Sequence, residues 1–421
     1  MGSGGNSCCV GEYAMPYRRK TPVILIALVL LLPLLGTRPL SVGAAQARNL
    51  TVVGHLDIEG GGMVDAQGDI AVIGHMEPPH ATSILDVSHP ARPRVLARIP
   101  TKPGTHSHKA RLCGTVLITN HERYGGWAPD GKVGLGFWDV ADPAHPREMA
   151  LLEMGGQNGG GAGVHRFQAD CARRLVYAGA NLEGYRGNIT LIVDFSDPAN
   201  PREISRWWMP GQWTAGGEKP AGAVGYRTHH PNRMGDRLYV PLWMGGLAVV
   251  DISDLMHPRT VSHLNYPRPS GAPTHTTLPV GHEILGRKWL VVFDEELGGG
   301  DPPAFMRLFD ITDEARPRQV SAYQAPRDAP PGVRFGAHQP HELVAPDNLV
   351  YAAWFAGGLR VVDIANPQRP TEVGRYLPRP AAGKRPPMSN DVFVDRRGLI
   401  YLIDRDNGLD ILRLGEKPER K

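Results

Sequence analysis

The sequence predicts an all-β fold, a seven-bladed β-propeller, from three observations. A short unit recurs seven times, in which an apolar run ends in Asp and leads into a polar turn that is usually rich in proline. Neighbouring copies of this Asp are 47 to 59 residues apart, the length of one four-stranded blade. The apolar runs are nearly continuous, as expected for sheets that neighbours cover on both faces. The repeated residues are Asp86, Asp139, Asp194, Asp251, Asp310, Asp363 and Asp410.

One unit illustrates the predicted blade. Residues 341–345 are expected to form an inner strand, and residues 349–354, rich in residues that favour strands, a second one. Gly357 and Gly358 make a tight turn into the third strand, and residues 371–377 complete the sheet at its outer edge. The repeated Asp ends the third strand, where its carboxylate can accept backbone N–H bonds from the turn. Because this Asp recurs in every unit, we assign it a structural role.

The third strands carry a resemblance to a known family. Leu191-Ile-Val-Asp194 and Leu247-Ala-Val-Val-Asp251 resemble the repeat after which the LVIVD-repeat family is named. The resemblance extends over about residues 50–413. It implies the propeller fold. It implies no particular activity, because propellers carry many unrelated functions.

The N-terminal segment predicts export. Arg18-Arg19-Lys20 precedes an apolar run at residues 21–35, and Ala45-Gln46-Ala47 is a small-x-small cleavage pattern. We therefore predict that residues 1–47 are a secretory signal peptide and that the protein is periplasmic or secreted. The alternative is an uncleaved anchor, the only membrane contact that we expect, although fifteen apolar residues are few for a membrane span.

The rest of the chain is expected to form one domain, residues 48–414, with a flexible tail at residues 415–421. Residues 49–56 resemble an outer strand, whereas the last unit, residues 391–413, contains only three strands. We infer that the N-terminal strand pairs with the last blade and closes the ring. Closure removes the exposed sheet edges, which favours this arrangement.

Cysteine usage and charge narrow the class of protein. Cys113 and Cys171 are the only cysteines beyond the predicted signal peptide, and they lie in corresponding turns of adjacent blades. They form either a disulfide, which export permits, or two buried thiols. Removal of the signal peptide takes three positive charges from a formal net charge of +4. No basic patch then remains that would favour nucleic acid as a partner.

The two faces of the predicted propeller differ. The turns between third and outer strands are short and nearly uniform, whereas the loops that lead into the inner strands are long and individual. Variable loops on a regular scaffold commonly carry function. Five of the seven inner strands are expected to begin with histidine, at the mouth of the central channel. The seven starting positions are Gly62, His108, His165, His230, His275, His341 and Asp391.

These histidines predict a metal site. Several imidazoles from separate strands suit transition metals rather than calcium or magnesium, and we favour copper or iron, with zinc as a further candidate. The predicted ligands are His108, His165, His230, His275 and His341. The residues predicted to orient them or to contact substrate are Glu295, Glu296, Glu342, His229, His338 and Asp391. His106 and Glu122 are further polar residues near the predicted channel mouth.

The favoured function is an oxidoreductase that acts on a small substrate at this metal. The architecture is similar to the selenium-binding protein and methanethiol oxidase group, which implies copper-dependent oxidation of a small thiol. It is also similar to carotenoid cleavage oxygenases, which implies iron held by four histidines. The first alternative is a non-enzymatic propeller that binds a ligand or an envelope protein. The second is a calcium-dependent hydrolase of the lactonase type, whose oxygen ligands five histidines match poorly.

Overall fold

All of the secondary structure that the computed structural model describes is β-structure, as the sequence predicts. The described residues are 46–124, 132–155, 161–220, 225–329, 332–380 and 386–416. They belong to one of two units of the chain, Val42–Lys421, which is considered by itself below. Residues 1–45 of the predicted signal peptide and residues 417–421 of the predicted tail lie outside the described part. The described residues contain no helix capable of crossing a membrane.

Five of the described sheets have four antiparallel strands. The first contains β3 (Gly61–Gln67), β4 (Ile70–His75), β5 (His80–Asp86) and β6 (Arg94–Pro100). The second contains β16 (Asn232–Met234), β17 (Arg237–Pro241), β18 (Leu247–Asp251) and β19 (Arg259–Leu264). The third contains β20 (Thr274–Pro279), β21 (Trp289–Asp294), β22 (Met306–Asp310) and β23 (Arg318–Tyr323).

The other two four-stranded sheets include the first strands of the described chain. One, in the order β1-β26-β25-β24, contains β1 (Gln46–Arg48), β24 (Leu349–Ala353), β25 (Leu359–Asp363) and β26 (Thr371–Leu377). The other, in the order β2-β29-β28-β27, contains β2 (Leu50–Leu56), β27 (Ser389–Val394), β28 (Leu399–Asp404) and β29 (Gly408–Leu414). The N-terminal strand β2 therefore pairs with β29 of the last repeat.

The sixth sheet has nine strands and consists of two halves. The first half contains β7 (Thr105–His106), β8 (Ala110–Cys113), β9 (Val116–Arg123), β10 (Gly134–Asp139) and β11 (Arg147–Glu153). The second contains β12 (Gly163–Asp170), β13 (Leu175–Asn181), β14 (Asn188–Asp194) and β15 (Arg202–Trp207). The halves meet where Glu122 of β9 pairs with Gly163 of β12. This contact brings Glu122 close to the start of β12.

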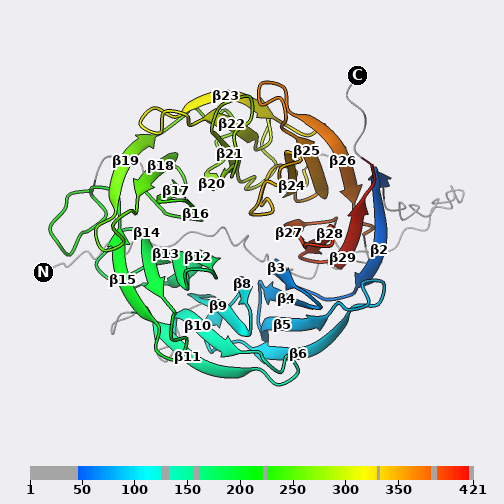
Figure 1. Cartoon of the computed structure of the whole chain (residues 1–421), viewed down its shortest axis with the longest axis horizontal. Coiled ribbons are helices and arrows are strands. Elements are labelled where there is room, and N and C mark those ends of the chain that lie inside the picture. Colours follow the sequence, from blue (N-terminus) through cyan, green and yellow to red (C-terminus); the bar gives the residue numbers. More distant parts are fainter. Residues whose placement is uncertain are drawn as a thin grey trace, which may run out of the picture. The chain divides into compact units, whose positions relative to one another are not determined.

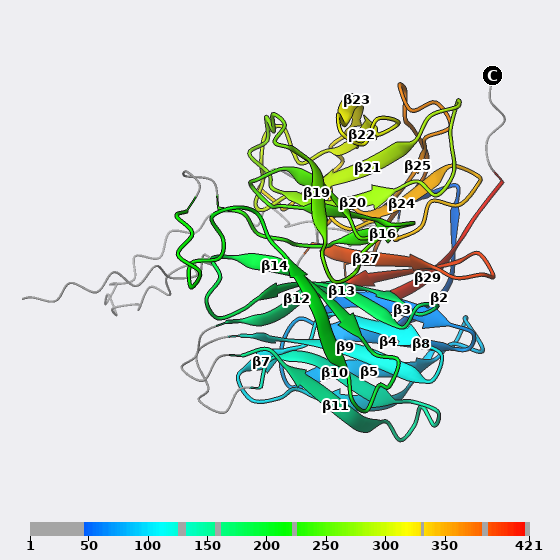
Figure 2. The same ribbon diagram turned by 60° about the vertical axis from the view of Figure 1, so that its left-hand side comes forward.

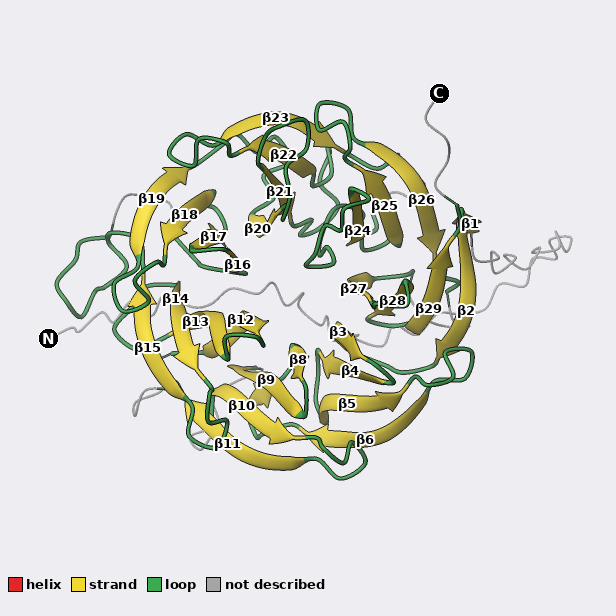
Figure 3. Cartoon of the chain, viewed as in Figure 1, coloured by secondary structure: helices red, strands yellow, loops and turns green. Residues whose placement is uncertain are grey.

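The sheets of this unit are arranged around a common centre, with β3, β8, β12, β16, β20 and β27 nearest to it (Figure 1). Figure 3 shows the same arrangement by type of structure, and Figure 2 shows the same sheets after a turn of 60°. Apolar side chains fill the space between neighbouring sheets. Phe137 of β10, Phe167 of β12 and Phe195 after β14, for example, are fully buried in one cluster.

One predicted strand differs. Residues 341–345, expected to be an inner strand, form no regular strand, and only a bridge between Pro340 and Ala352 connects this segment to β24. The N–H of His338 still donates to Ala353 and the N–H of His341 to Tyr351. Proline has no N–H to contribute to a ladder, and this accounts for the interruption.

The structural role predicted for the repeated Asp is confirmed in six repeats. In each, one carboxylate oxygen accepts the backbone N–H of the residue two positions later, at 2.8 to 3.0 Å. These residues are Asp86, Asp139, Asp194, Asp251, Asp310 and Asp363. Asp410 of the shortened last repeat instead accepts from Tyr376 and contacts His55 at 2.8 Å.

The two alternatives for the cysteines are also resolved. Cys113 and Cys171 form a disulfide, with their Cα atoms 5.2 Å apart. Cys113 ends β8 and Cys171 follows β12, the innermost strands of the two halves of the nine-stranded sheet. Because inner strands converge toward the centre, their turns are close enough for a covalent bond.

The contact between His55 and Asp410 predicts a pH-dependent stability. The hydrogen bond with Asp410 is the main reason why the pKa of His55 is raised above its usual 6.5, and burial opposes it. A raised folded-state pKa stabilises the fold below the unfolded-state pKa, and that stabilisation is lost as the pH rises through the folded-state value. Urea unfolding should show His55→Gln to be less stable than wild type by about 0.2–1 kcal/mol at pH 5.5.

At pH 8.5 the difference between the two proteins should shrink toward zero, because His55 is then neutral in both the folded and unfolded states. His257→Gln is the control, since His257 is exposed and pairs only within its own turn. An unfolding difference for His55→Gln that stays constant between the two pH values would contradict the assignment.

Candidate metal centre

Six histidines follow one another near the centre of the molecule, and we call them the histidine row. Their ring centroids are separated by 4.1 to 5.1 Å from one member to the next. Three belong to strands β7, β12 and β20, and the others lie in the segments that lead into β8, β16 and β24. Five members are buried, and His165 is partly buried. In order, the row consists of His106, His108, His165, His229, His275 and His338.

His165 and His229, in the middle of the row, face each other through ring nitrogens that carry no hydrogen in the neutral form. His165 donates its Nδ1–H to both carboxylate oxygens of Glu122, at 2.7 and 3.0 Å. His229 donates its Nδ1–H to the carbonyl of His275 at 3.1 Å, because a carbonyl can only accept. In a neutral imidazole the remaining nitrogen then carries a lone pair. The two Nε2 atoms are nevertheless only 2.9 Å apart.

Burial disfavours the charged form of both rings. Burial is the main cause that lowers the pKa of His165 to about 4, although Glu122 acts in the opposite direction. Burial, together with the charge of neighbouring His275, lowers the pKa of His229 far below its usual range. A proton shared between the two Nε2 atoms is therefore disfavoured. Two facing lone pairs at 2.9 Å repel each other, and a metal ion bound between or beside them could relieve this repulsion.

A second group of facing polar atoms lies at the end of the row near His338. His338 donates its Nδ1–H to the carbonyl of Asn390 at 2.6 Å, so its Nε2 carries the lone pair. The Nε2 atoms of His275 and His338 lie 3.7 and 3.9 Å from the carboxylate of Glu295. Arg334 holds that carboxylate at 2.7 Å. These rings and Glu295 thus face one another without direct hydrogen bonds.

His106 begins the row and contacts Glu122 from the other side. It donates its Nδ1–H to the carbonyl of Met76 at 3.0 Å, and its Nε2 lies 3.0 Å from Glu122 Oε2. Burial opposes ionisation of Glu122, but the neighbouring His165 and His106 outweigh it and hold the pKa of the carboxyl below its usual range. Glu122 is therefore ionised and contacts two members of the row.

Two sets of side chains have the composition and spacing of a metal site. The ligand atoms within each set lie within 4.8 Å of one another. The first set is His106, His108 and Glu122, and the second is His229, His275 and Glu295. His165 lies between them, because it contacts Glu122 with one nitrogen and His229 with the other.

The row includes three of the five predicted ligands and excludes two. His108, His165 and His275 are members, whereas His230 and His341 lie beside Glu342. His230 Nε2 lies 3.1 Å from Glu342, and Nδ1 of this ring has no hydrogen-bond partner among the described residues. His341 Nδ1 accepts the N–H of Val394 at 3.3 Å.

The difference between the predicted ligands and the members of the row has a geometric reason at His229 and His230. Successive side chains of an extended segment point to opposite sides, so a phase error of one residue exchanges His229 for His230. His229, which the sequence indicates only as a supporting residue, therefore takes the place in the row that it assigns to His230. His338 takes the place assigned to His341, but these residues are three positions apart, so a shift of one residue does not account for that exchange. His106 and Glu122 are also part of the arrangement, although the sequence indicates them only as polar neighbours.

The remaining predicted supporting residues have varied contacts. Glu295 faces the row as expected. Glu296 instead accepts the backbone N–H groups of Gly298, Gly300 and Ala304, so it caps its own loop. Asp391 accepts the N–H of Val64, and burial raises its pKa to about 6. Among the described residues, neither Glu296 nor Asp391 forms a hydrogen bond or ion pair with a ring of the row.

Beside the row lies a layer of buried charge. Glu342 contacts Arg111, Arg166 at 2.6 Å and His230 at 3.1 Å. Lys109 is also buried, and burial is the main cause that lowers its pKa far below the usual range, with Arg166 acting in the same direction. Burial is the main cause that lowers the pKa of five members of the row, and Lys109 acts in the same direction.

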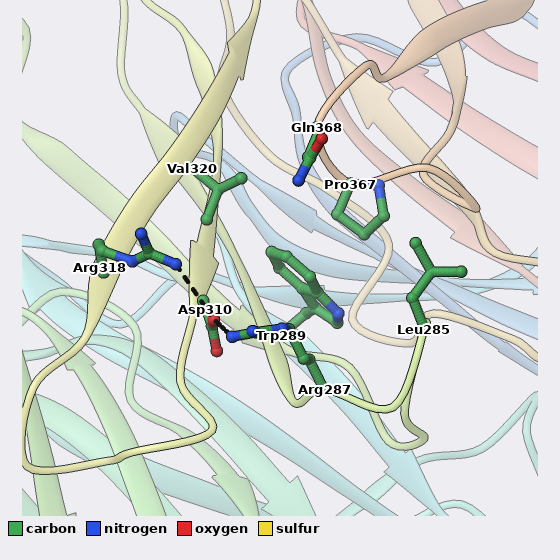
Figure 4. Close-up of a pocket in the computed structure, with 8 residues that line it drawn as sticks. All are labelled: Leu285, Arg287, Trp289, Asp310, Arg318, Val320, Pro367 and Gln368. Atoms are coloured by element: carbon green, nitrogen blue, oxygen red, sulfur yellow. Dashed lines mark hydrogen bonds and ion pairs between the residues drawn. The ribbon is translucent and has the colours of Figure 1, made fainter.

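A separate surface pocket of about 260 Å³ lies away from the row. Trp289, the first residue of β21, lines it, whereas Glu295 follows the opposite end of that strand. Figure 4 shows Arg287 and Arg318 directed at Asp310, at 2.5 and 3.7 Å, so the pocket borders one of the repeated turns. Val320 and Pro367 complete its apolar wall. This pocket belongs to the repeated face of the scaffold.

Comparisons with known proteins support the fold. Three segments of the chain, residues 185–207, 234–265 and 342–377, match the LVIVD repeat. They contain the third strands β14, β18 and β25, where the sequence itself suggests the resemblance. No curated protein matches the chain.

Solved structures of low identity share the architecture. The β-propeller domain of Cps50 (Swd1) from Myceliophteria thermophila is 15% identical, with a TM-score of 0.53 over 86% of this chain and 99% of that one. Saccharomyces cerevisiae Sqt1 is 8% identical, with a TM-score of 0.52 over 87% of this chain and 88% of that one. At such identities the likeness shows the fold alone.

The fold and these comparisons define the protein class as a β-propeller. Within that class, the chain is an all-β protein that carries LVIVD repeats and holds two groups of histidine and glutamate suited to metal.

The charge layer predicts a large stability effect at Glu342. Glu342→Ala would leave Arg111 and the fully buried Arg166 without their shared carboxylate. Removing one partner of a buried ion pair costs roughly 3–5 kcal/mol, so urea unfolding should show a loss of this size. Lys132→Ala, which removes an exposed pair with Glu153, is the control and should unfold like wild type. An equally stable Glu342→Ala would show that the arginines are paired by other means.

Proposed function

We propose that this protein is an exported, metal-dependent oxidoreductase that acts on a small substrate. The metal would bind at the histidine row through Nε2 of His165, His229 and His275, with Glu295 as a fourth ligand or its neighbour. The observation that carries this proposal is the 2.9 Å separation of two Nε2 atoms whose rings both use Nδ1–H elsewhere. Ligating histidines characteristically donate their other N–H to a carboxylate or carbonyl in this way.

We propose further that the propeller has seven blades in a closed ring. The two halves of the nine-stranded sheet, β8 to β11 and β12 to β15, each repeat the order of four antiparallel strands found in the other sheets. Counting them separately gives seven units, in agreement with the seven repeats of the sequence. The pairing of β2 with β29 supports closure between the two ends of the array.

The donor set favours particular metals. Three imidazoles and one carboxylate suit iron, copper or zinc, and they are too rich in nitrogen for calcium. Copper or iron would supply one-electron chemistry, whereas zinc would act as a Lewis acid. We favour copper or iron for the proposed oxidoreductase. The calcium-dependent hydrolase is the least supported of the alternatives, because the acidic residues at the row are each held by histidine or arginine.

The side chains of Lys109 and Arg334 suggest which roles this chain would have in the oxidation of a substrate. Oxidation of a small molecule releases protons, and the buried Lys109 directly follows His108 of the row in the chain. Its lowered pKa makes it a suitable acceptor for such a proton. Arg334 would keep Glu295 ionised and oriented toward the rings. Export remains part of the proposal, supported by the apolar segment before Ala47 and by the disulfide.

Metal content tests the proposal directly. Mature protein from Arg48 onward, purified without a histidine tag, should retain close to stoichiometric copper, iron or zinc after dialysis. His229→Ala should lose at least tenfold in affinity for this metal, because it removes one of the two facing nitrogens. His341→Ala is the matched control: it deletes a buried histidine outside the row and should retain the metal.

The outcomes separate the candidate functions. Copper or iron that is lost in His229→Ala would support the oxidoreductase and direct the search toward oxidisable small molecules. The absence of transition metal after reconstitution would contradict it and favour a non-enzymatic binding propeller. Circular dichroism of each variant establishes that the β-fold persists, so that loss of metal is not confused with unfolding.

A further inference from the structure

We propose that the histidine row binds a second metal ion, held by His106, His108 and Glu122 beside the first ion. The inference rests on the proposed function, because it adds a position to the same row. The sequence predicts one metal ion at the channel mouth, whereas we place two ions along the row. The two positions correspond to the two groups of ligands that lie on either side of His165.

The geometry of His106 carries the inference. Its Nδ1–H is donated to the carbonyl of Met76, so its Nε2 carries a lone pair in the neutral ring. That lone pair faces an oxygen of the ionised Glu122 at 3.0 Å. Two acceptors at this distance repel each other unless a proton or a metal cation lies beside them. The three residues are largely buried, so water cannot easily screen this repulsion.

His108 supplies the third donor of the proposed site. Its ring lies 4.2 Å from that of His106, centroid to centroid, and it is almost fully buried. The ligand atoms of His106, His108 and Glu122 lie within 4.8 Å of one another, so a modest movement brings all three to bonding distance of one ion.

Glu122 connects the two proposed positions. One carboxylate contacts His106 and also accepts the Nδ1–H of His165, whose Nε2 faces the first site. The carboxylate and the imidazole therefore form a continuous bridge between the two ions. We expect the occupancy of one site to influence the affinity of the other, since a cation on Glu122 weakens its hydrogen bond to His165.

A proton is the competing explanation. If His106 were protonated, its imidazolium would form an ion pair with Glu122 and no ion would be required at this end of the row. The two explanations predict different metal stoichiometries. A proton on His106 gives one ion per chain, whereas the proposed second site gives two.

The test is a metal titration of the mature chain. Protein stripped with a chelator is titrated with Co²⁺, Cu²⁺ and Zn²⁺ in separate experiments, and the bound metal is counted after gel filtration. We expect two ions per chain for wild type. His106→Ala should bind one ion, and His229→Ala should also bind one, because each variant removes a ligand from a different site.

Matched controls keep the test specific. His257→Ala removes an exposed histidine of a repeated turn and should still bind two ions. Co²⁺ absorption reports the ligand environment, so the single ions left in His106→Ala and His229→Ala should give different spectra. The melting temperature of each stripped variant shows whether the fold persists.

The outcomes distinguish the two proposals. One ion per wild-type chain, lost in His229→Ala and unaffected in His106→Ala, would overturn the second site and leave the proposed function intact. No bound transition metal in wild type would overturn both. Two ions in wild type that fall to one in His106→Ala would establish the pair.

Discussion

The site depends on one constraint. A neutral imidazole has a single N–H, so a ring that donates it to a fixed acceptor presents a lone pair on its other nitrogen. His229 and His338 donate to backbone carbonyls, and His165 donates to an ionised carboxylate. Burial lowers the pKa of these rings and so disfavours protons on their remaining nitrogens. The result is a set of lone pairs that face one another in a region with little water. Bound cations would stabilise such a set, because buried polar atoms without partners are costly.

The scaffold explains how such a set can be tolerated before a metal binds. Antiparallel sheets around a common centre hold the segments that carry the row, and the turns at the repeated Asp residues are fixed by their own hydrogen bonds. The disulfide and the pairing of Glu122 with Gly163 join the two halves of the nine-stranded sheet near His165. The buried ion pairs of Glu342 tie further inner segments together. These contacts hold the segments that carry the row in place.

Much of the fold could be predicted from the sequence, because it is encoded locally and repeatedly. The repeated Asp turns and the third strands follow from short patterns, and the pairing of β2 follows from the missing strand in the last repeat. The site was harder to predict. The sequence predicts that histidines gather at the inner strands. The choice between His229 and His230, however, depends on a shift of one residue in the predicted start of the strand. Glu122 joins the row only because β9 pairs with β12, a contact between repeats that no local pattern encodes.

The measurement that tests the central claim most directly is anomalous X-ray diffraction from crystals of the metal-loaded protein, recorded on both sides of the absorption edge. The account predicts an anomalous peak about 2.0–2.2 Å from Nε2 of both His165 and His229. A peak beside His230 and His341, or an empty row in which the two rings have turned to hydrogen-bond each other or water, would contradict it.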